Sequence, residues 1–95
     1  MSKDYSQGKV YGIYFEDKLR YVGSTILDLP KRMSYHRQDA KKERCNGKIY
    51  QEMNENGIEN YYIELIEIVN CNSKEELLKR EGHFQRLYRD YLIWL

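Results

Sequence analysis

Glu81 is the acidic residue whose position most strongly suggests chemistry. It lies in a predicted helix that begins near Ser73, where Ser73 and Glu76 have the spacing of a capping box. Because a carboxylate on the core side of a helix needs a cation or hydrogen-bond donors, this position indicates a metal ion or a buried basic partner. The alternative is that Glu81 lies at the edge of the apolar stripe and reaches water. The apolar residues that define the stripe are Leu77, Leu78, Phe84, Leu87, Tyr88 and Tyr91.

Positive charge is concentrated in one segment of the chain. The net charge of all 95 residues is only +1, but residues 1–48 carry a net charge of +5 and residues 49–95 one of −4. A folded chain that gathers these cations on one face would attract the phosphate backbone of a nucleic acid. The alternative is a solvated helix surface. The basic residues of the densest stretch are Lys31, Arg32, Arg37, Lys41, Lys42, Arg44 and Lys48.

The cysteines and histidines exclude a zinc finger. Cys45 and Cys71 are 26 residues apart, His36 and His83 are 47 apart, and no Cys-X-X-Cys motif occurs. A disulfide between the two cysteines is an open alternative, but we expect two free thiols.

Two segments near the N-terminus predict a β-hairpin. Residues 8–15 and 19–23 are rich in β-branched and aromatic residues, and residues 16–18 between them form a turn. With an even loop, alternation along the strands places Gly12, Tyr14, Tyr21 and Gly23 on one face. Tyr11, Ile13 and Val22 then share the other face, whereas an odd loop would separate the two sets.

The rest of the chain predicts three helices and one more strand. A helix follows Asp28 to about Lys41, with Leu29, Met33 and Ala40 buried. A second helix spans residues 47–56, capped by Asn46, with Ile49, Tyr50 and Met53 facing the core. Residues 61–69 form the third strand, and the last helix follows. The order β-β-α-α-β-α predicts an α+β fold with a small three-stranded antiparallel sheet in a single domain, residues 1–95.

Gly12-Ile13-Tyr14, followed by Tyr21-Val22-Gly23, resembles the signature of the GIY-YIG nuclease family. Three further features are similar to family members: Leu29-Pro30-Lys31-Arg32 has the form Leu-X-X-Arg, His36 follows Arg32 by four residues, and Arg80-Glu81 occupies the last helix. The resemblance covers about Lys9 to Leu87 and implies the same small antiparallel sheet flanked by helices.

The resemblance implies a divalent-metal-dependent endonuclease that hydrolyses DNA and leaves a 3′-hydroxyl and a 5′-phosphate. Tyr14 would be the general base, helped by His36, and Tyr21 would position water or phosphate. Arg32 would clamp the phosphate, and Glu81 would be the single protein ligand of Mg²⁺ or Mn²⁺. Gly12 and Gly23 would let the nucleic-acid backbone approach closely. The cations expected to contact DNA are Lys31, Arg37, Lys41 and Lys42.

One feature departs from the family pattern. Active members carry an asparagine after the last helix, and this sequence has none after Asn72. Either the chain is truncated at its C-terminus, or the natural protein lacks the residue, or another group replaces it. The alternative function is therefore an inactive nucleic-acid-binding or scaffold module that keeps the fold.

The sequence gives weaker indications about partners and location. No sequence-reading element is evident, so we expect low sequence specificity, with targeting from a homodimer, a partner subunit or another domain. The composition resembles that of proteins from a virus or other mobile element. No signal peptide or stretch of about 18 apolar residues is present, which predicts an intracellular protein that does not enter a membrane.

Overall fold

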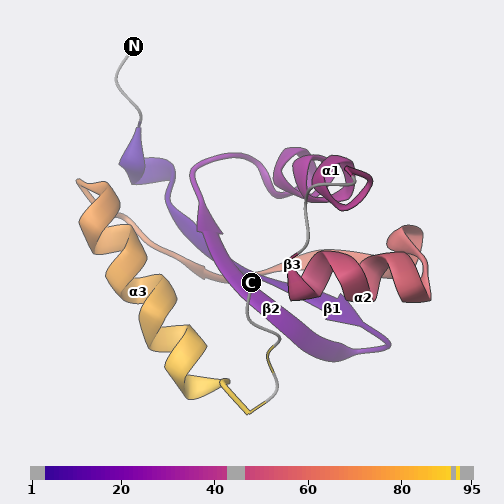
Figure 1. Cartoon of the computed structure of the whole chain (residues 1–95). Helices are drawn as coiled ribbons and strands as arrows, with labels where there is room; N and C mark the ends of the chain where they lie inside the picture. Colours follow the sequence, from indigo (N-terminus) through magenta and orange to yellow (C-terminus); the bar gives the residue numbers. More distant parts are fainter. Residues whose placement is uncertain (1–3, 43–46, 91, 93–95) are drawn as a thin grey trace.

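A three-stranded antiparallel sheet lies at the centre of the fold (Figure 1). The computed structural model describes residues 4–42, 47–90 and 92. The strands are β1 (Lys9–Phe15), β2 (Lys18–Thr25) and β3 (Tyr61–Ile68), in the order β2-β1-β3. The helices are α1 (Leu29–Ala40), α2 (Lys48–Asn56) and α3 (Lys74–Leu87), with short 3₁₀ turns η1 (Tyr5–Gln7) and η2 (Ile58–Asn60). The predicted α+β class, element order and antiparallel sheet are confirmed.

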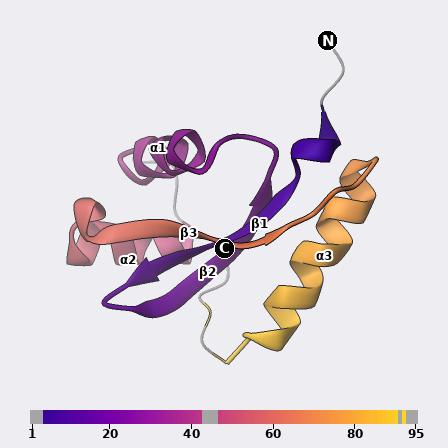
Figure 2. The same cartoon turned by 180° about the vertical axis from the view of Figure 1, so that it is seen from behind.

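The two faces of the sheet are covered by different helices, as Figures 1 and 2 show from opposite sides. Helices α1 and α2 cover one face, and the buried core lies between them and the sheet. The other face is covered by α3, which contacts β1 and β2, and Leu77 is its buried residue. The core residues on the first face are Tyr11, Ile13, Met33, Ala40, Ile49, Met53 and Tyr61.

The hairpin contains a bulge that sets which side chains share a face. Glu16 and Asp17 form a two-residue turn with positive φ angles of 51° and 62°, so the loop is even. However, Tyr14 pairs with Leu19 whereas Ile13 pairs with Tyr21, which leaves Arg20 as an extra residue in β2. Because one extra residue reverses the alternation, Tyr21 and Gly23 lie on the face of Tyr11 and Ile13. The predicted face of Gly12, Tyr14, Tyr21 and Gly23 is therefore wrong.

The helix ends largely follow the predicted signals. Ser73 Oγ accepts a hydrogen bond from the backbone N–H of Glu76 at 3.3 Å at the start of α3. Gly57, with a φ of 94°, ends α2 in a conformation that favours glycine. Asp28 precedes α1 but makes no side-chain capping bond. The predicted cap Asn46 lies outside the described residues, as do Cys45 and Tyr91.

The buried stripe of α3 is narrower than its sequence indicates. Leu77 is buried and Phe84 and Tyr88 are half-buried, but Leu78 is 44% exposed and Leu87 59% exposed. Because α3 packs alone on its side of the sheet, residues about 100° off the contact line find no partner there. The prediction that Leu78 and Leu87 are buried is therefore wrong. Within the described ranges, no helix has the length and apolar character needed to span a membrane.

Candidate active site

Tyr11 is the centre of a hydrogen-bonded group that joins β1 to α1 and α2. Its side chain is fully buried, and its Oη lies 2.7 Å from Nε2 of His36. The Nε of Arg32 donates to the same oxygen at 3.2 Å. The other ring nitrogen of His36, Nδ1, lies 3.0 Å from the hydroxyl of Tyr50. Arg32 and His36, one turn apart on α1, thus meet at a tyrosine that sequence reasoning had placed in the apolar core.

The direction of these hydrogen bonds follows from Arg32, which can only donate. Tyr11 Oη accepts from Arg32, and among the described residues its one other hydrogen-bond partner is Nε2 of His36, so the hydroxyl hydrogen donates to Nε2. Nε2 then carries no hydrogen, and Nδ1–H donates to the hydroxyl of Tyr50. This pattern assigns His36 to its neutral Nδ1–H tautomer.

Burial and charge keep both central groups neutral. Burial, with a smaller contribution from the Arg32 charge, lowers the pKa of His36 to about 4. Burial raises the pKa of Tyr11 to about 12, against the opposing effect of Arg32. The charge of Glu81 also acts on the Tyr11 hydroxyl and raises its pKa. The charges of Arg32 on α1 and of Glu81 on α3 thus shift the pKa of Tyr11 in opposite directions.

Tyr21 borders this group from β2. Its ring centroid lies 6.3 Å from that of Tyr11 and 5.6 Å from that of His36, the latter in edge-on geometry. Burial raises the pKa of its hydroxyl, and the charge of Glu81 acts in the same direction. The Arg20 bulge brings Tyr21 to this side of the sheet.

Tyr14 lies elsewhere. Its ring stacks on that of Tyr62, with centroids 5.6 Å apart and planes 13° from parallel. It lines a separate surface hollow with Asp17, Lys18, Leu19 and Tyr88. Since Tyr14 is on the opposite side of β1 from Tyr11, it cannot share the hydrogen bonds of His36 and Arg32. The structure therefore brings Tyr21, Arg32, His36 and Glu81 together but leaves Tyr14 apart.

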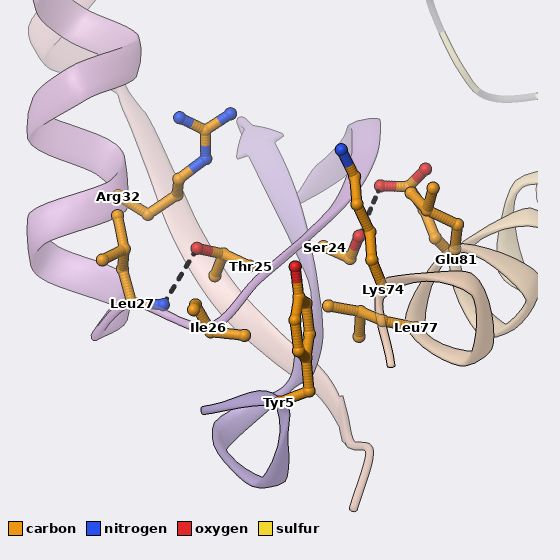
Figure 3. A pocket seen from close by; sticks show the side chains of 10 residues that line it. Tyr5, Ser24, Thr25, Ile26, Leu27, Arg32, Lys74, Leu77 and Glu81 are labelled. Atoms are coloured by element: carbon orange, nitrogen blue, oxygen red, sulfur yellow. Dashed lines mark hydrogen bonds between the residues drawn. The ribbon is translucent and has the colours of Figure 1, made fainter. Parts of the chain in front are cut away.

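Glu81 faces a cavity at the edge of this group (Figure 3). The hydroxyl of Ser24, from β2, donates to Oε1 of Glu81 at 2.8 Å. The cavity has a volume of about 350 Å³, and Arg32 also lines it. In Figure 3, Arg32 and Glu81 lie on opposite sides of Tyr5, and their charged groups both lie in the upper part of the view. Among the described residues, Nε is the nitrogen of Arg32 that has a protein partner.

The donor set at Glu81 fits a hard divalent cation. Within residues 4–42, 47–90 and 92, no three His, Cys, Asp or Glu side chains cluster as metal ligands. A half-buried carboxylate beside a hydroxyl nevertheless suits Mg²⁺, which keeps several waters and takes further oxygens from substrate phosphates. Glu81 is half-buried, accepts a hydrogen bond from Ser24 and makes no ion pair with another described residue.

The two glycines make room for protein atoms. A Cβ on Gly23 would lie 2.5 Å from Oη and 2.7 Å from Cζ of Tyr11. A Cβ on Gly12 would lie 2.5 Å from Cδ1 of Leu19. Both glycines are buried, so the expected close approach of a nucleic-acid backbone finds no open surface at either position.

The predicted basic residues have different surroundings in the structure. Lys31 is exposed near the start of α1, and Lys42 is exposed and pairs with Asp39 at 3.2 Å. Arg37 donates to the backbone oxygen of Tyr61 at 2.9 Å. Arg37 and Lys41 line a second hollow, beside η2, that is not lined by Arg32 or Glu81. The segment therefore contributes Arg32 to the site, and DNA contact by Lys31, Arg37, Lys41 and Lys42 stays a prediction.

Comparison with known families identifies the domain. The family model described as the GIY-YIG catalytic domain matches residues 7–92. The chain belongs to the GIY-YIG family. Neither a search of curated proteins nor a search of solved structures found a significant match. Membership makes this a nuclease-type domain, as the two tripeptides predict.

In this GIY-YIG domain, the sequence reasoning missed three site residues: Tyr11, Tyr50 and Ser24. Tyr11 follows Val10 at the centre of β1, and the tripeptide Gly12-Ile13-Tyr14 drew attention to the next tyrosine instead. The pairing of β1 with β2 distinguishes Tyr11 from Tyr14. Tyr11 pairs with Gly23, and Gly23 leaves room for the large ring opposite it. Tyr50 was assigned to the core, where it packs while its hydroxyl reaches His36.

Proposed function

We propose that this domain is a divalent-metal-dependent endonuclease that hydrolyses phosphodiester bonds of DNA, with Tyr11 as its general base. The observation that supports the proposal is that Arg32 donates to the Tyr11 hydroxyl and lines the same cavity as Glu81. One hydroxyl accepts a hydrogen bond from Arg32, contacts a neutral imidazole, and feels the charge of a carboxylate that lines a cavity. This combination supplies a cation for phosphate, a site for a metal and a route for a proton.

Arg32 binds the substrate phosphate in this proposal. Its Nε is fixed on Tyr11, and its terminal nitrogens, which have no partner among the described residues, would donate to the phosphoryl oxygens. A guanidinium can make both sets of contacts because its donors are spread over a planar fork. The scissile phosphate would thereby lie next to the Tyr11 hydroxyl.

Tyr11 and His36 accept the proton of the attacking water. As the water oxygen bonds to phosphorus, the bond from phosphorus to the leaving 3′ oxygen breaks. Oη of Tyr11 takes the proton of the attacking water, and the leaving 3′ oxygen takes a proton from solvent. The hydrogen already on Oη passes to Nε2 of His36, 2.7 Å away. The pKa of His36, about 4 in the absence of substrate, rises when the negative phosphate offsets the charge of Arg32.

Glu81 would hold Mg²⁺ or Mn²⁺, with Ser24 fixing the carboxylate through its hydrogen bond to Oε1. When bound, such an ion neutralises charge on the phosphoryl oxygens and lowers the pKa of a coordinated water. The products expected from the family resemblance are a 3′-hydroxyl and a 5′-phosphate.

Nicking of supercoiled plasmid tests this function. Wild-type protein at low salt should nick the plasmid with Mg²⁺ or Mn²⁺, and EDTA should stop the reaction. Glu81→Gln should lower the rate at least 100-fold, whereas Glu75→Gln, at an exposed acidic position on the same helix, should not change it. Nicking that survives Glu81→Gln would exclude the metal site. Plasmid binding without nicking would favour the non-catalytic DNA-binding module.

A further inference from the structure

The cavity beside Glu81 has a wall that phosphate hydrolysis does not require. Ser24, Arg32 and Glu81 form part of its lining, but the lining also includes aromatic and aliphatic side chains (Figure 3). The volume of about 350 Å³ lies within the range of roughly 300–1,000 Å³ that small-molecule pockets occupy. A phosphate and a hydrated cation need only polar partners. The apolar part of the wall is made by Tyr5, Ile26, Leu27, Leu77 and Leu78.

Tyr5 is held in place by the short turn η1. The backbone oxygen of Tyr5 accepts from the N–H of Gly8 at 3.0 Å and from Sγ of Cys71 at 3.2 Å. Asp4 caps the same turn by accepting from the N–H of Ser6 at 3.0 Å. In Figure 3, the Tyr5 ring rises from the turn into the space between Arg32 and Glu81. An aromatic ring is thereby presented to the cavity by a fixed piece of backbone.

Leu78 and Lys74 also line the cavity. Leu78 is 44% exposed although it lines the cavity, so an apolar surface remains available to a ligand. Lys74 is the first residue of α3, and in Figure 3 its amino group lies in the same upper part of the view as the guanidinium of Arg32. The cavity therefore offers an aromatic face, aliphatic contacts and a second cation beside the Arg32 site.

We propose that this wall is a subsite for one unstacked nucleoside of the substrate strand, next to the phosphate that Arg32 binds. Tyr5 stacks on the base, the leucines contact the base and sugar, and Lys74 contacts the adjacent phosphate. Stacking on aromatic side chains is how proteins hold exposed bases without reading their sequence. A paired base must first leave its stack to enter such a pocket. The inference rests on the proposed nuclease function and names its substrate class: DNA that is single-stranded or carries an unpaired nucleotide.

Cleavage of two matched oligonucleotides tests the use of the subsite. One duplex is fully paired, and the other has the same sequence with a single unpaired nucleotide. Wild-type protein should cut the second at least tenfold faster, and Tyr5→Ala should reduce this ratio about tenfold. Tyr35→Ala, which removes a 41% exposed tyrosine on α1 that does not line the cavity, should leave the ratio unchanged. Equal cleavage of the two duplexes would overturn the inference.

Binding of small probes separates the subsite from catalysis. In metal-free NMR titrations, thymidine 5′-monophosphate should shift the methyl signals of Leu27, Leu77 and Leu78, and Tyr5→Ala should abolish these shifts. Deoxyribose 5-phosphate and inorganic phosphate, which lack a base, should not shift these methyl signals. Absence of nucleotide-specific shifts overturns the inference while leaving the nuclease function intact. If the wild type cuts neither duplex, the nuclease function fails and the titration alone decides the subsite.

Discussion

The hydroxyl of Tyr11 lies 2.7 Å from Nε2 of His36, inside the fold. Arg32 donates to that hydroxyl, and the hydroxyl of Tyr50 accepts from Nδ1 of His36 on the other side of the ring. Each group in the chain from Arg32 through Tyr11 and His36 to Tyr50 therefore donates to the next. A buried polar chain of this kind is stable because each of its members has a partner. A single hydrogen bond in this chain also links Tyr11, the proposed general base, to His36, a neutral group that can accept a proton.

Replacement of the two candidate tyrosines should separate their roles. Tyr11→Phe removes the hydroxyl that contacts Arg32 and His36, and we expect metal-dependent nicking to fall by about 10²–10⁴-fold, the usual contribution of general acid–base catalysis. Tyr14→Phe removes a hydroxyl on the opposite face and should leave the rate within about twofold. Single-turnover nicking rates of the two variants measure the difference. A larger loss for Tyr14→Phe would restore the assignment made from the tripeptide.

Arg32→Lys should be a damaging substitution despite keeping the charge. Lysine carries its three donors on one nitrogen at the end of a flexible stem, so it lacks the planar fork that lets arginine contact Tyr11 and a phosphate at the same time. We expect the nicking rate to fall about 100-fold, comparable to the loss of one transition-state donor, with little change in unfolding free energy. Arg86→Lys, at an exposed position on α3, serves as the control. Retention of more than half the rate would show that Arg32 acts only as a point charge.

Stability should depend on the protonation of His36. Its pKa is about 4 in the folded protein and near 6.5 in the unfolded chain, so the unfolded chain binds the extra proton first. Stability is therefore complete above about pH 7 and is lost as the pH falls from 6.5 toward 4, by about 2 kcal/mol at pH 5. Urea unfolding at pH 7 and pH 5 measures this loss. In His36→Gln the same interval should show a clearly smaller change, and an equal change would assign the effect to other groups.

Gly23→Ala and Gly82→Ala should have opposite effects on stability. A Cβ at Gly23 would overlap the buried Tyr11 ring, and overpacking of this kind costs about 1–3 kcal/mol. A Cβ at Gly82 in α3 would meet only the flexible end of Arg86, at 3.2 Å, and should stabilise the helix by about 0.5–1 kcal/mol. Urea midpoints of the two variants provide the comparison. Nicking should fall in Gly23→Ala because Tyr11 has to move.

The elements of the fold were predictable because their signals are local. Ser73 and Glu76 mark the start of α3, Gly57 ends α2, and Met33 and Ala40 have helical spacing. The relative positions of residues within one helix were also predictable. Arg32 and His36 are four residues apart on α1, so helix geometry alone puts them one turn apart. The domain boundary, the homodimer or partner subunit, and the intracellular location stay predictions.

The position of each tyrosine was not predictable from local spacing. Whether Tyr11 or Tyr14 joins His36 depends on the register of β1 against β2, and that register depends on Arg20. Nothing in the identity of Arg20 indicates a bulge; its guanidinium is held by Glu52 of α2, at 2.9 Å, across 32 residues. The bulge that puts Tyr11 rather than Tyr14 in the site is therefore accompanied by a contact with a residue distant in the sequence, Glu52.

The bulge at Arg20 also divides the hairpin into two regions that tolerate changes in length differently. At Glu16 and Asp17, a loop or a peptide tag of any length could be inserted while the bulge keeps Tyr21 and Gly23 in phase with Tyr11. Removal of Arg20, in contrast, would turn Tyr21 and Gly23 toward α3 and Val22 toward α1 and α2, which would dismantle the site. An alignment of homologous chains by hairpin length alone would thus match Tyr14 to the site tyrosine. An alignment on Gly23 and the aromatic residue that pairs with it would match Tyr11 instead.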